Sequence, residues 1–442
     1  METSKAMELD QNHYKYSLYK MCCIIITCFF IYPFKLNISY WWLVNLLYYF
    51  IPLVFVFLNL NIIKCVLRRI FTKKMYFFSV AFLCFSFIWS YIVFSFSGDF
   101  SFIANCFVKP IWKLLRFLFI FLLVLKVYGQ ENCFVAYIRV LMYATMLYVV
   151  FSLYMIVDID FATYWLSLVQ PEKEAIITRN FSRIGLMGRT FADTSMFISL
   201  VVLGVCMVGR MVGLSKLDKV GFCFLLVGNV LYGRLGLLLS LIVLMFWIRP
   251  SFRIKIKTIL YTIFIGLIVA TSFFVFISFL NPVVLDAISD WLFDPVNALL
   301  TSSSNKLSFG QSGDELFYDM YFSLDLDTIL HGDGFYEREG VRYMGTDPAF
   351  IRKILYGGVI QMFLMYFSAI LFLFGFYKYS SSFTKSCLKK IVLLSGMILF
   401  FGEMKDTVFS NWFIMMIMFS ISNFYDQLHS NVIGRPAMKS QA

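Results

Sequence analysis

The chain has 442 residues, of which 60% are hydrophobic, 20% are aromatic and only 14% are charged. With a mean hydropathy of +0.79, this composition excludes an ordinary soluble domain and indicates a polytopic membrane protein. A net charge of +12 would suggest nucleic-acid binding in a soluble chain. In a membrane protein the question is where the basic residues lie relative to the bilayer, so we expect no nucleic-acid partner.

The apolar runs predict an all-α fold with about twelve transmembrane helices, because a bilayer span needs about 20 mostly apolar residues. The predicted spans cover residues 17–33, 40–62, 75–96, 106–128, 134–157, 194–213, 220–233, 235–248, 258–280, 354–376, 391–402 and 407–424. All of them belong to a single polytopic domain, residues 1–442. The polar N-terminal segment has no small-residue cleavage site after it, so we expect the first span to be retained.

Short basic connections predict the orientation of these spans. Lysines and arginines follow the second, sixth, eighth and tenth spans, which places those connections and both termini in the cytoplasm. Residues 158–193 and 281–353 then form a first loop and a large loop outside the cytoplasm. Their arginines do not oppose this orientation, because long loops are exempt from the positive-inside rule. We therefore expect the chemistry to take place on the outer face.

The large loop is predicted to be folded, since it holds apolar and aromatic residues throughout and structureless loops of this length are uncommon. Apolar residues at helical spacing over 285–299 predict a helix on the membrane surface. A second helix is predicted over 314–330. It is followed by a His331–Gly334 turn, where the glycines permit a tight backbone.

Two pairs of short apolar runs predict helical hairpins. Arg234 separates the seventh and eighth runs, and an exposed arginine at the bilayer centre would cost at least about 3 kcal/mol. We therefore place Arg234 at a water-reachable outer tip. The last two runs repeat this arrangement, with Glu403, Lys405 and Asp406 at their tip. Interrupted pairs also occur in transporters, so this feature alone does not separate an enzyme from a carrier.

A cluster of arginines and glycines closes the first loop: Arg179, Arg183, Gly185, Gly188 and Arg189. A guanidinium group binds two phosphate oxygens in bidentate geometry and stays charged at every physiological pH. This cluster therefore predicts a site for a lipid phosphate or pyrophosphate. Anchoring to lipid headgroups is the alternative. For Arg179 the two interpretations are equally supported. For Arg183 and Arg189 headgroup anchoring is less supported, because the neighbouring glycines allow a ligand to approach the backbone closely.

A second cluster lies at the end of the large loop and contains Asp347, Arg352 and the Gly357–Gly358 pair. A carboxylate with an arginine five residues later could place a general base beside an anionic leaving group. Asp347 directly before Pro348 is also an ordinary helix N-cap, and the pattern alone favours the cap.

The remaining polar candidates do not predict a metal site. The Asp325 and Asp327 pair is interpreted as a solvated turn, and of the three histidines only His331 is placed to act. The ten cysteines lie in apolar runs or near span ends, which implies neither disulfides nor a thiolate site. We therefore expect no metal and no cofactor.

Three basic residues fall in the outer half of the fourth span: Lys109, Lys113 and Arg116. They either line a polar cavity or extend their side chains to the membrane surface. The second interpretation fits Lys109 and Lys113 better.

In order and placement, these motifs resemble those of the O-antigen polymerase (Wzy) family. That family is related to the O-antigen ligases and belongs to the broad class of polytopic lipid-sugar glycosyltransferases (GT-C-like). The resemblance covers most of the topology. It rests on Arg183, Gly185 and Gly188 ahead of a span, Arg234 between short spans, the Gly332 and Gly334 turn, Asp347 followed by Gly357 and Gly358, and Lys405 in the penultimate hairpin.

Members of this family join undecaprenyl-pyrophosphate-linked oligosaccharide units at the periplasmic face of the bacterial inner membrane. The resemblance therefore implies a metal-independent glycosyltransferase that polymerises a surface polysaccharide from a polyprenyl-pyrophosphate-linked donor. Residues 158–193 and 281–353 become periplasmic loops. The implied partners are the lipid-linked oligosaccharide, membrane lipid and a chain-length regulator protein.

The same resemblance implies roles for individual residues. Asp347 is the implied base, and His331 is the second candidate. The ligases carry a histidine where Asp347 stands, which favours polymerase over ligase. Where relatives often have an arginine, this chain departs from the family with Asp314 and Glu315. The implied pyrophosphate-binding residues are Arg183, Arg189, Arg234, Arg352 and Lys405.

Two alternatives stay open. An O-antigen ligase lies within the same class of enzyme. A lipid-linked oligosaccharide flippase, or another carrier, predicts short loops and charges along an inner cavity. The acidic large loop disfavours that second alternative.

Overall fold

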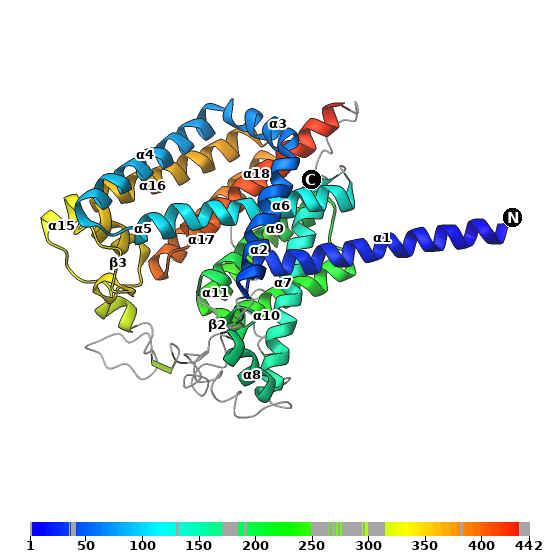
Figure 1. The fold of residues 1–442 in the computed structure, drawn as a ribbon, viewed down its shortest axis with the longest axis horizontal. Helices are drawn as coiled ribbons and strands as arrows, with labels where there is room; N and C mark the ends of the chain where they lie inside the picture. Colours follow the sequence, from blue (N-terminus) through cyan, green and yellow to red (C-terminus); the bar gives the residue numbers. More distant parts are fainter. Residues whose placement is uncertain are drawn as a thin grey trace.

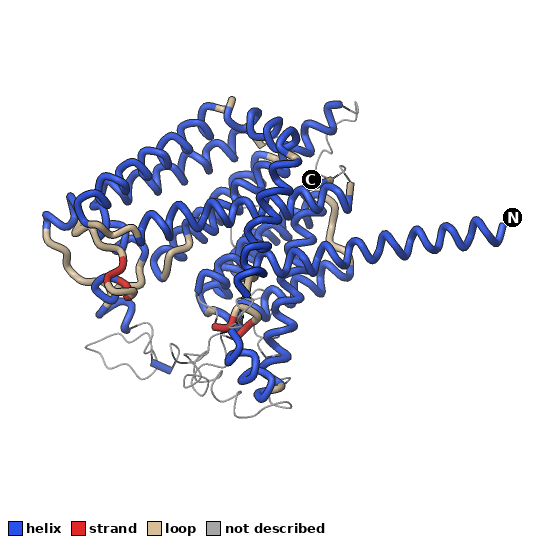
Figure 2. The backbone as a smooth tube through the Cα atoms, viewed as in Figure 1, coloured by secondary structure: helices blue, strands red, loops and turns tan. Residues whose placement is uncertain are grey.

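The apolar runs fold into α-helices, as the composition predicts, and helix makes up nearly all of the regular structure in the computed structural model (Figure 2). The structure describes residues 2–34, 36, 41–129, 132–169, 184–189, 192–248, 314–380 and 383–432, with a few single positions between 264 and 298. The predicted span 258–280 and the predicted surface helix 285–299 fall almost wholly outside these ranges.

Figure 1 shows the described helices, coloured in chain order. They are α1 (Glu2–Ile31), α2 (Trp41–Leu58), α3 (Leu60–Phe71), α4 (Lys74–Ser97), α5 (Ser101–Ile103), α6 (Lys109–Tyr128), α7 (Cys133–Val157), α8 (Ile159–Val169), α9 (Ala192–Met211), α10 (Lys216–Tyr232), α11 (Arg234–Ile248), α15 (Leu326–His331), α16 (Ala349–Tyr379), α17 (Lys385–Lys405) and α18 (Phe409–Val432).

Two antiparallel hairpins complete the described fold. Strands β1 (Ile184–Gly185) and β2 (Gly188–Arg189) pair Ile184 with Arg189. Strands β3 (Glu337–Arg338) and β4 (Val341–Arg342) pair Glu337 with Arg342. The β3–β4 connection is Glu339–Gly340, and both of its residues have positive φ, which is the geometry of a tight hairpin turn.

Four described helices are long and apolar enough to cross a membrane: Lys74–Ser97, Cys133–Val157, Asp193–Met211 and Ala349–Tyr379. A fifth candidate is the bent pair Trp42–Leu58 and Leu60–Phe71. These are the helices of a membrane-embedded protein. The most enclosed of them is α9, which packs against α7, α10, α11 and α17.

The predicted span 40–62 is not one straight helix, because the chain bends by 76° between α2 and α3. Asn59 lies at the bend outside helical geometry, and its side-chain amide donates to the Phe55 carbonyl at 2.7 Å. Helix α3 is amphipathic. It buries Ile63, Val66 and Ile70 at helical spacing and carries Arg68 and Arg69 in its last turn.

Helices α4 and α16 lie side by side and are joined by polar contacts (Figure 1). The Gln361 amide donates to Ser86 at 2.6 Å, and the Ser79 hydroxyl donates to the Ser368 carbonyl at 2.8 Å. Small residues and buried hydrogen bonds are the usual means of joining helices in lipid, where there is no hydrophobic drive between them. The opposite face of α4 is exposed and apolar.

The backbone of α16 breaks at Gly357 and Gly358, where φ/ψ values are −138°/24° and 68°/−170°. The break releases carbonyls from the helix, and other segments satisfy them. The Asp333 N–H donates to the Leu355 carbonyl at 2.6 Å, and the Trp89 indole donates to the Gly357 carbonyl at 2.9 Å. The residues that follow α15 therefore contact the break in α16 directly through their backbone.

The last two apolar runs lie within helices longer than predicted, α17 and α18, and the chain passes from one to the other at Asp406, where the predicted tip lies. One prediction about the large loop is wrong. The predicted helix over 314–330 is instead a π-helical turn, Glu315–Asp319, followed by bends and α15. Asp325 starts α15 in an extended conformation and accepts the Thr328 N–H at 2.7 Å, so a single helix cannot run through it.

The Gly358→Ala substitution is expected to destabilise the protein by more than about 2 kcal/mol. A Cβ at this positive φ would overlap the Leu330 carbonyl oxygen, which is held by backbone and cannot move aside. Gly98→Ala is the matched control: φ is +74°, and a Cβ there meets no described atom within 4 Å, so only the strain of about 1 kcal/mol applies. Thermal unfolding of both purified variants in detergent measures the difference, and equal shifts would contradict the account.

Candidate functional site

A polar cavity of about 220 Å³ lies where α16 begins, beside the β3–β4 hairpin, the π-helical turn Ala104–Val108 and the α17–α18 connection. We call it the charged cavity. Its lining residues are Asn105, Cys106, Tyr336, Glu337, Arg342, Arg352, Lys353, Met365, Thr407, Phe409 and Ser410. Three of these are cations, so the cavity is suited to a charged ligand.

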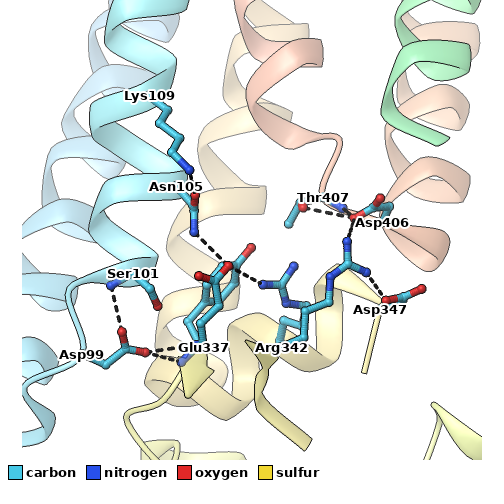
Figure 3. A network of polar contacts seen from close by, with 11 residues as sticks. Asp99, Ser101, Asn105, Lys109, Glu337, Arg342, Asp347, Asp406 and Thr407 are labelled. Carbon is cyan, nitrogen blue, oxygen red and sulfur yellow. Dashed lines mark hydrogen bonds and ion pairs between the residues drawn. The ribbon is translucent and has the colours of Figure 1, made fainter. Parts of the chain in front are cut away.

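Arg342 connects two carboxylates at the edge of the charged cavity (Figure 3). It is the last residue of β4 and donates to Asp347 and, at 3.3 Å, to Asp406. Burial alone would lower the pKa of the Arg342 guanidinium, but the Asp406 and Asp347 carboxylates raise it above its ordinary value. Arg342 is therefore a permanent cation that holds both aspartates in place.

The structure places Asp347 beside an arginine, but not beside the arginine that the sequence suggested. The N-cap of α16 is Pro348, so the prediction that Asp347 caps this helix is wrong. Its carboxylate turns to Arg342, which precedes it by five residues, instead of to Arg352, which follows it by five. The reason is the β3–β4 hairpin, which brings Arg342 back beside the start of α16.

Arg352 is almost fully buried, with 4% of its side chain exposed. Its Nη2 lies 3.7 Å from Glu337 Oε1, and its guanidinium carbon lies 3.8 Å from the centre of the Tyr336 ring. Its Nε has no hydrogen-bond partner in the described structure. Glu337 also accepts a hydrogen bond from the Asn105 amide at 3.1 Å. Arg352 thus presents a partly unused set of donors at the cavity wall.

Asp99 fixes this wall to the loop after α4 (Figure 3). Its Oδ2 accepts the N–H groups of Tyr336 at 2.6 Å and Glu337 at 3.2 Å, and its Oδ1 accepts the Ser101 N–H at 2.8 Å. Burial raises the pKa of Tyr336 well above its ordinary range, so its phenol stays neutral beside Arg352. The β3 strand is therefore held from both sides.

Lys353, which lines the charged cavity, belongs to a buried ion pair. Lys353 and Glu403 pair with no exposed surface on either side chain, and Tyr366 donates to the same carboxylate. The other oxygen of Glu403 accepts the N–H groups of Val408 and Phe409, each at 2.6 Å. One carboxylate thus joins α16, the end of α17 and the start of α18.

Lys113 of α6 is half-buried. It donates to Asn411 of α18, so the prediction that it extends to the membrane surface is wrong. Asp193 of α9 interacts electrostatically with both Lys113 and Asp406. Lys109 is exposed, and its ammonium donates to Asn105 at 2.5 Å.

The other sequence-predicted candidates are spread over the molecule. His331 has 69% of its side chain exposed, pairs with Asp327 at 2.9 Å and does not line the charged cavity. Arg234 starts α11, as predicted between short helices, and its Nη1 lies 3.7 Å from Asp294. Lys405 ends α17 directly before Asp406. Arg183, and the side chain of Arg189, lie outside the described residues.

Sequence reasoning missed Arg342, Glu337, Lys353 and the role of Glu403 as the partner of Lys353. The one usable signal was the Glu339–Gly340 pair between short polar strands, which marks a hairpin turn and hence a reversal of the chain. Nothing in the sequence reports the pairing of Lys353 with Glu403, which are 50 residues apart.

Comparison of the chain with protein-family models, with curated proteins and with solved structures gave no match. Among the described residues, no three His, Cys, Asp or Glu side chains are grouped to hold a metal ion. The charged cavity itself is therefore the basis for a functional assignment.

Lys353→Met is expected to destabilise the protein by about 3 kcal/mol or more, because it leaves the buried Glu403 carboxylate without its cation. The double variant Lys353→Met/Glu403→Gln should recover part of this loss, since a neutral glutamine can still accept from the Val408 and Phe409 N–H groups. Thermal unfolding of both single variants and the double variant tests this. Strictly additive losses would contradict a direct ion pair.

Proposed function

We propose that this chain is a surface-polysaccharide polymerase that joins undecaprenyl-pyrophosphate-linked oligosaccharide units. The observation that carries the proposal is a cavity at the end of the large loop that is lined by Arg342, Arg352 and Lys353, with Asp347 in an ion pair with Arg342. Permanent cations beside a carboxylate supply what transfer from a pyrophosphate requires: stabilisation of the leaving group and a proton acceptor.

In the proposed reaction, a sugar hydroxyl of one unit attacks the anomeric carbon of the growing chain. The C–O bond to pyrophosphate breaks, and the undecaprenyl pyrophosphate leaves with the electron pair as the new glycosidic bond forms. Asp347 takes the hydroxyl proton, with His331 as the second candidate. Arg352 and Arg342 stabilise the charge that develops on the pyrophosphate, and the reaction needs no metal.

Arg342 can serve this role without releasing its aspartates. A guanidinium has five N–H donors, and the contacts with Asp347 and Asp406 use Nη1 and Nη2 for one acceptor each. The remaining donors are available to phosphate oxygens. Arg183, Arg189, Arg234 and Lys405 remain proposed pyrophosphate-binding residues.

The proposed setting is the bacterial inner membrane, with both termini in the cytoplasm and about twelve spans. The described apolar helices support membrane embedding. Residues 158–193 and 281–353 are proposed to be periplasmic, and a chain-length regulator protein is a proposed partner. The donor and acceptor would both reach the protein from the membrane, since both carry a polyprenyl chain.

Asp347→Asn is expected to reduce polymer formation by at least about 100-fold, because the amide cannot accept the hydroxyl proton. Gel profiles of surface polysaccharide from a deletion strain measure this, with membrane expression checked. Wild type should restore a ladder, and the variant should give only single capped units. Asp319→Asn is the matched control, since this aspartate is exposed in the same loop and is not paired with Arg342.

A full ladder from Asp347→Asn would contradict the proposed base. Completed polymer that stays unattached in the deletion strain and becomes attached when wild type is supplied would indicate a ligase. Lipid-linked units trapped on the cytoplasmic side of the deletion strain would indicate a flippase.

His331→Ala is expected to retain the ladder in the same strain. Its imidazole is exposed and pairs with Asp327 on α15, so its loss should leave the charged cavity intact. Loss of the ladder with normal membrane expression would move the role of base from Asp347 to His331.

A further inference from the structure

A second cavity, of about 470 Å³, lies between α1, α2 and α6 and is separate from the charged cavity. We call it the aromatic cavity. Its lining residues are Phe29, Pro33, Phe34, Val44, Asn45, Tyr48, Tyr49, Lys109, Trp112 and Arg116. It combines two cations with aromatic walls, and its lining contains no acidic residue.

The two cations lie on one face of α6. Lys109, Trp112 and Arg116 are spaced by three and four residues, so their side chains lie one above another. Lys109 is the first residue of α6, and Arg116 lies two turns further on, about 10 Å deeper along the helix. The positive charge therefore extends from the rim of the aromatic cavity into its interior.

Arg116 has few partners for a partly buried cation. Its Nη1 donates to the Phe30 carbonyl at 3.4 Å, and its guanidinium carbon lies 4.9 Å from the centre of the Tyr48 ring. Its Nε is buried without a hydrogen-bond partner, and no described carboxylate forms an ion pair with it. Because an uncompensated cation within an apolar helix bundle is costly, an anionic ligand would complete this site.

The walls of the aromatic cavity favour a ligand with an apolar chain. Tyr49 packs edge-on against Trp112 at 5.4 Å, and Phe29 packs edge-on against both Phe34 and Tyr48 at 5.5 Å. An inorganic anion would leave these walls uncovered. A phosphate group attached to a long hydrocarbon chain would use both the cations and the walls.

The two cavities are connected through three side chains (Figure 3). Lys109 lines the aromatic cavity and donates to Asn105, and Asn105 donates to Glu337 at the charged cavity at 3.1 Å. A phosphate held at Lys109 would therefore lie close to the proposed reaction site.

We infer that the aromatic cavity binds the phosphate end of a long-chain lipid, with Arg116 and Lys109 as its cations. The further assignment of that lipid as the second polyprenyl-linked substrate rests on the proposed function. A polymerase must hold two such lipids at once, and the charged cavity provides for one pyrophosphate.

Native mass spectrometry of the purified full chain with undecaprenyl phosphate tests this inference without any turnover. Arg116→Gln is expected to bind one molecule fewer than wild type at saturation and to lose at least tenfold in affinity for that molecule. Arg210→Gln is the matched control, because Arg210 likewise donates to one backbone carbonyl, that of Trp247 at 2.8 Å, and lies in neither cavity. The control should bind as wild type does. Diacylglycerol, which has no phosphate, should not bind at this cavity.

If Arg116→Gln does not fold, Lys109→Gln gives the same test, since Lys109 is exposed and a glutamine amide can still donate to Asn105. We expect at least a threefold loss of affinity. Unchanged stoichiometry and affinity in a folded Arg116→Gln or Lys109→Gln variant would overturn the inference.

Competition with phosphatidylglycerol separates the two sources of a lipid phosphate. Weak competition supports the cavity as a polyprenyl-phosphate site. Equal competition overturns its assignment as a substrate site while supporting a site for lipid phosphate. The number of lipid molecules bound by wild type and by Arg116→Gln does not depend on the proposed reaction. A negative result in the ladder assay would therefore contradict the proposed function and leave this inference standing.

Discussion

The break in α16 is the constraint on which the rest of the site depends. A helix that continued through Gly357 and Gly358 would use the Leu355 carbonyl internally and leave no place for the end of α15. With the break, that carbonyl accepts the Asp333 N–H, and the Gly332 backbone approaches the glycine pair too closely for any side chain. The folded end of the large loop is therefore tied to a membrane helix by its backbone, and its β3–β4 hairpin is held at the start of α16.

The charges at the site are arranged so that none of the buried ones is isolated. Glu403 is paired with Lys353 and also accepts two backbone N–H groups from the start of α18. In a low-dielectric interior, an unpaired ion of either sign would cost several kcal/mol. The pair therefore fixes α16, α17 and α18 relative to one another, and the more exposed cation, Arg342, is left at the cavity edge where a ligand can reach it.

The two cavities differ in the means by which their cations are compensated. At the charged cavity, each cation is ion-paired: Arg342 with Asp347 and Asp406, Arg352 with Glu337, and Lys353 with Glu403. In the aromatic cavity, Arg116 has a ring face and a carbonyl. A balanced site holds its shape without a ligand and can stabilise charge that changes during a reaction. An unbalanced site gains more from binding an anion that keeps its charge, which suits a holding role.

The sequence by itself determined the fold class, most helix positions and the place of Arg234 at the start of a helix. Apolar runs and the polar residues that interrupt them are local features of the sequence, and a bilayer span requires an apolar run of a given length. It also identified Asp347, Arg352 and the Gly357–Gly358 pair as candidate site residues.

Only the tertiary structure decided what these residues contact. Asp347 could cap a helix or face a cation, and the hairpin that returns Arg342 to its side made the choice. Lys353 and Glu403 look like span-end charges in the sequence, and their pairing depends on how α16 and α17 pack. Contacts across tens of residues are set by helix packing, which depends on side-chain shape and buried hydrogen bonds and leaves no periodic signal in the chain.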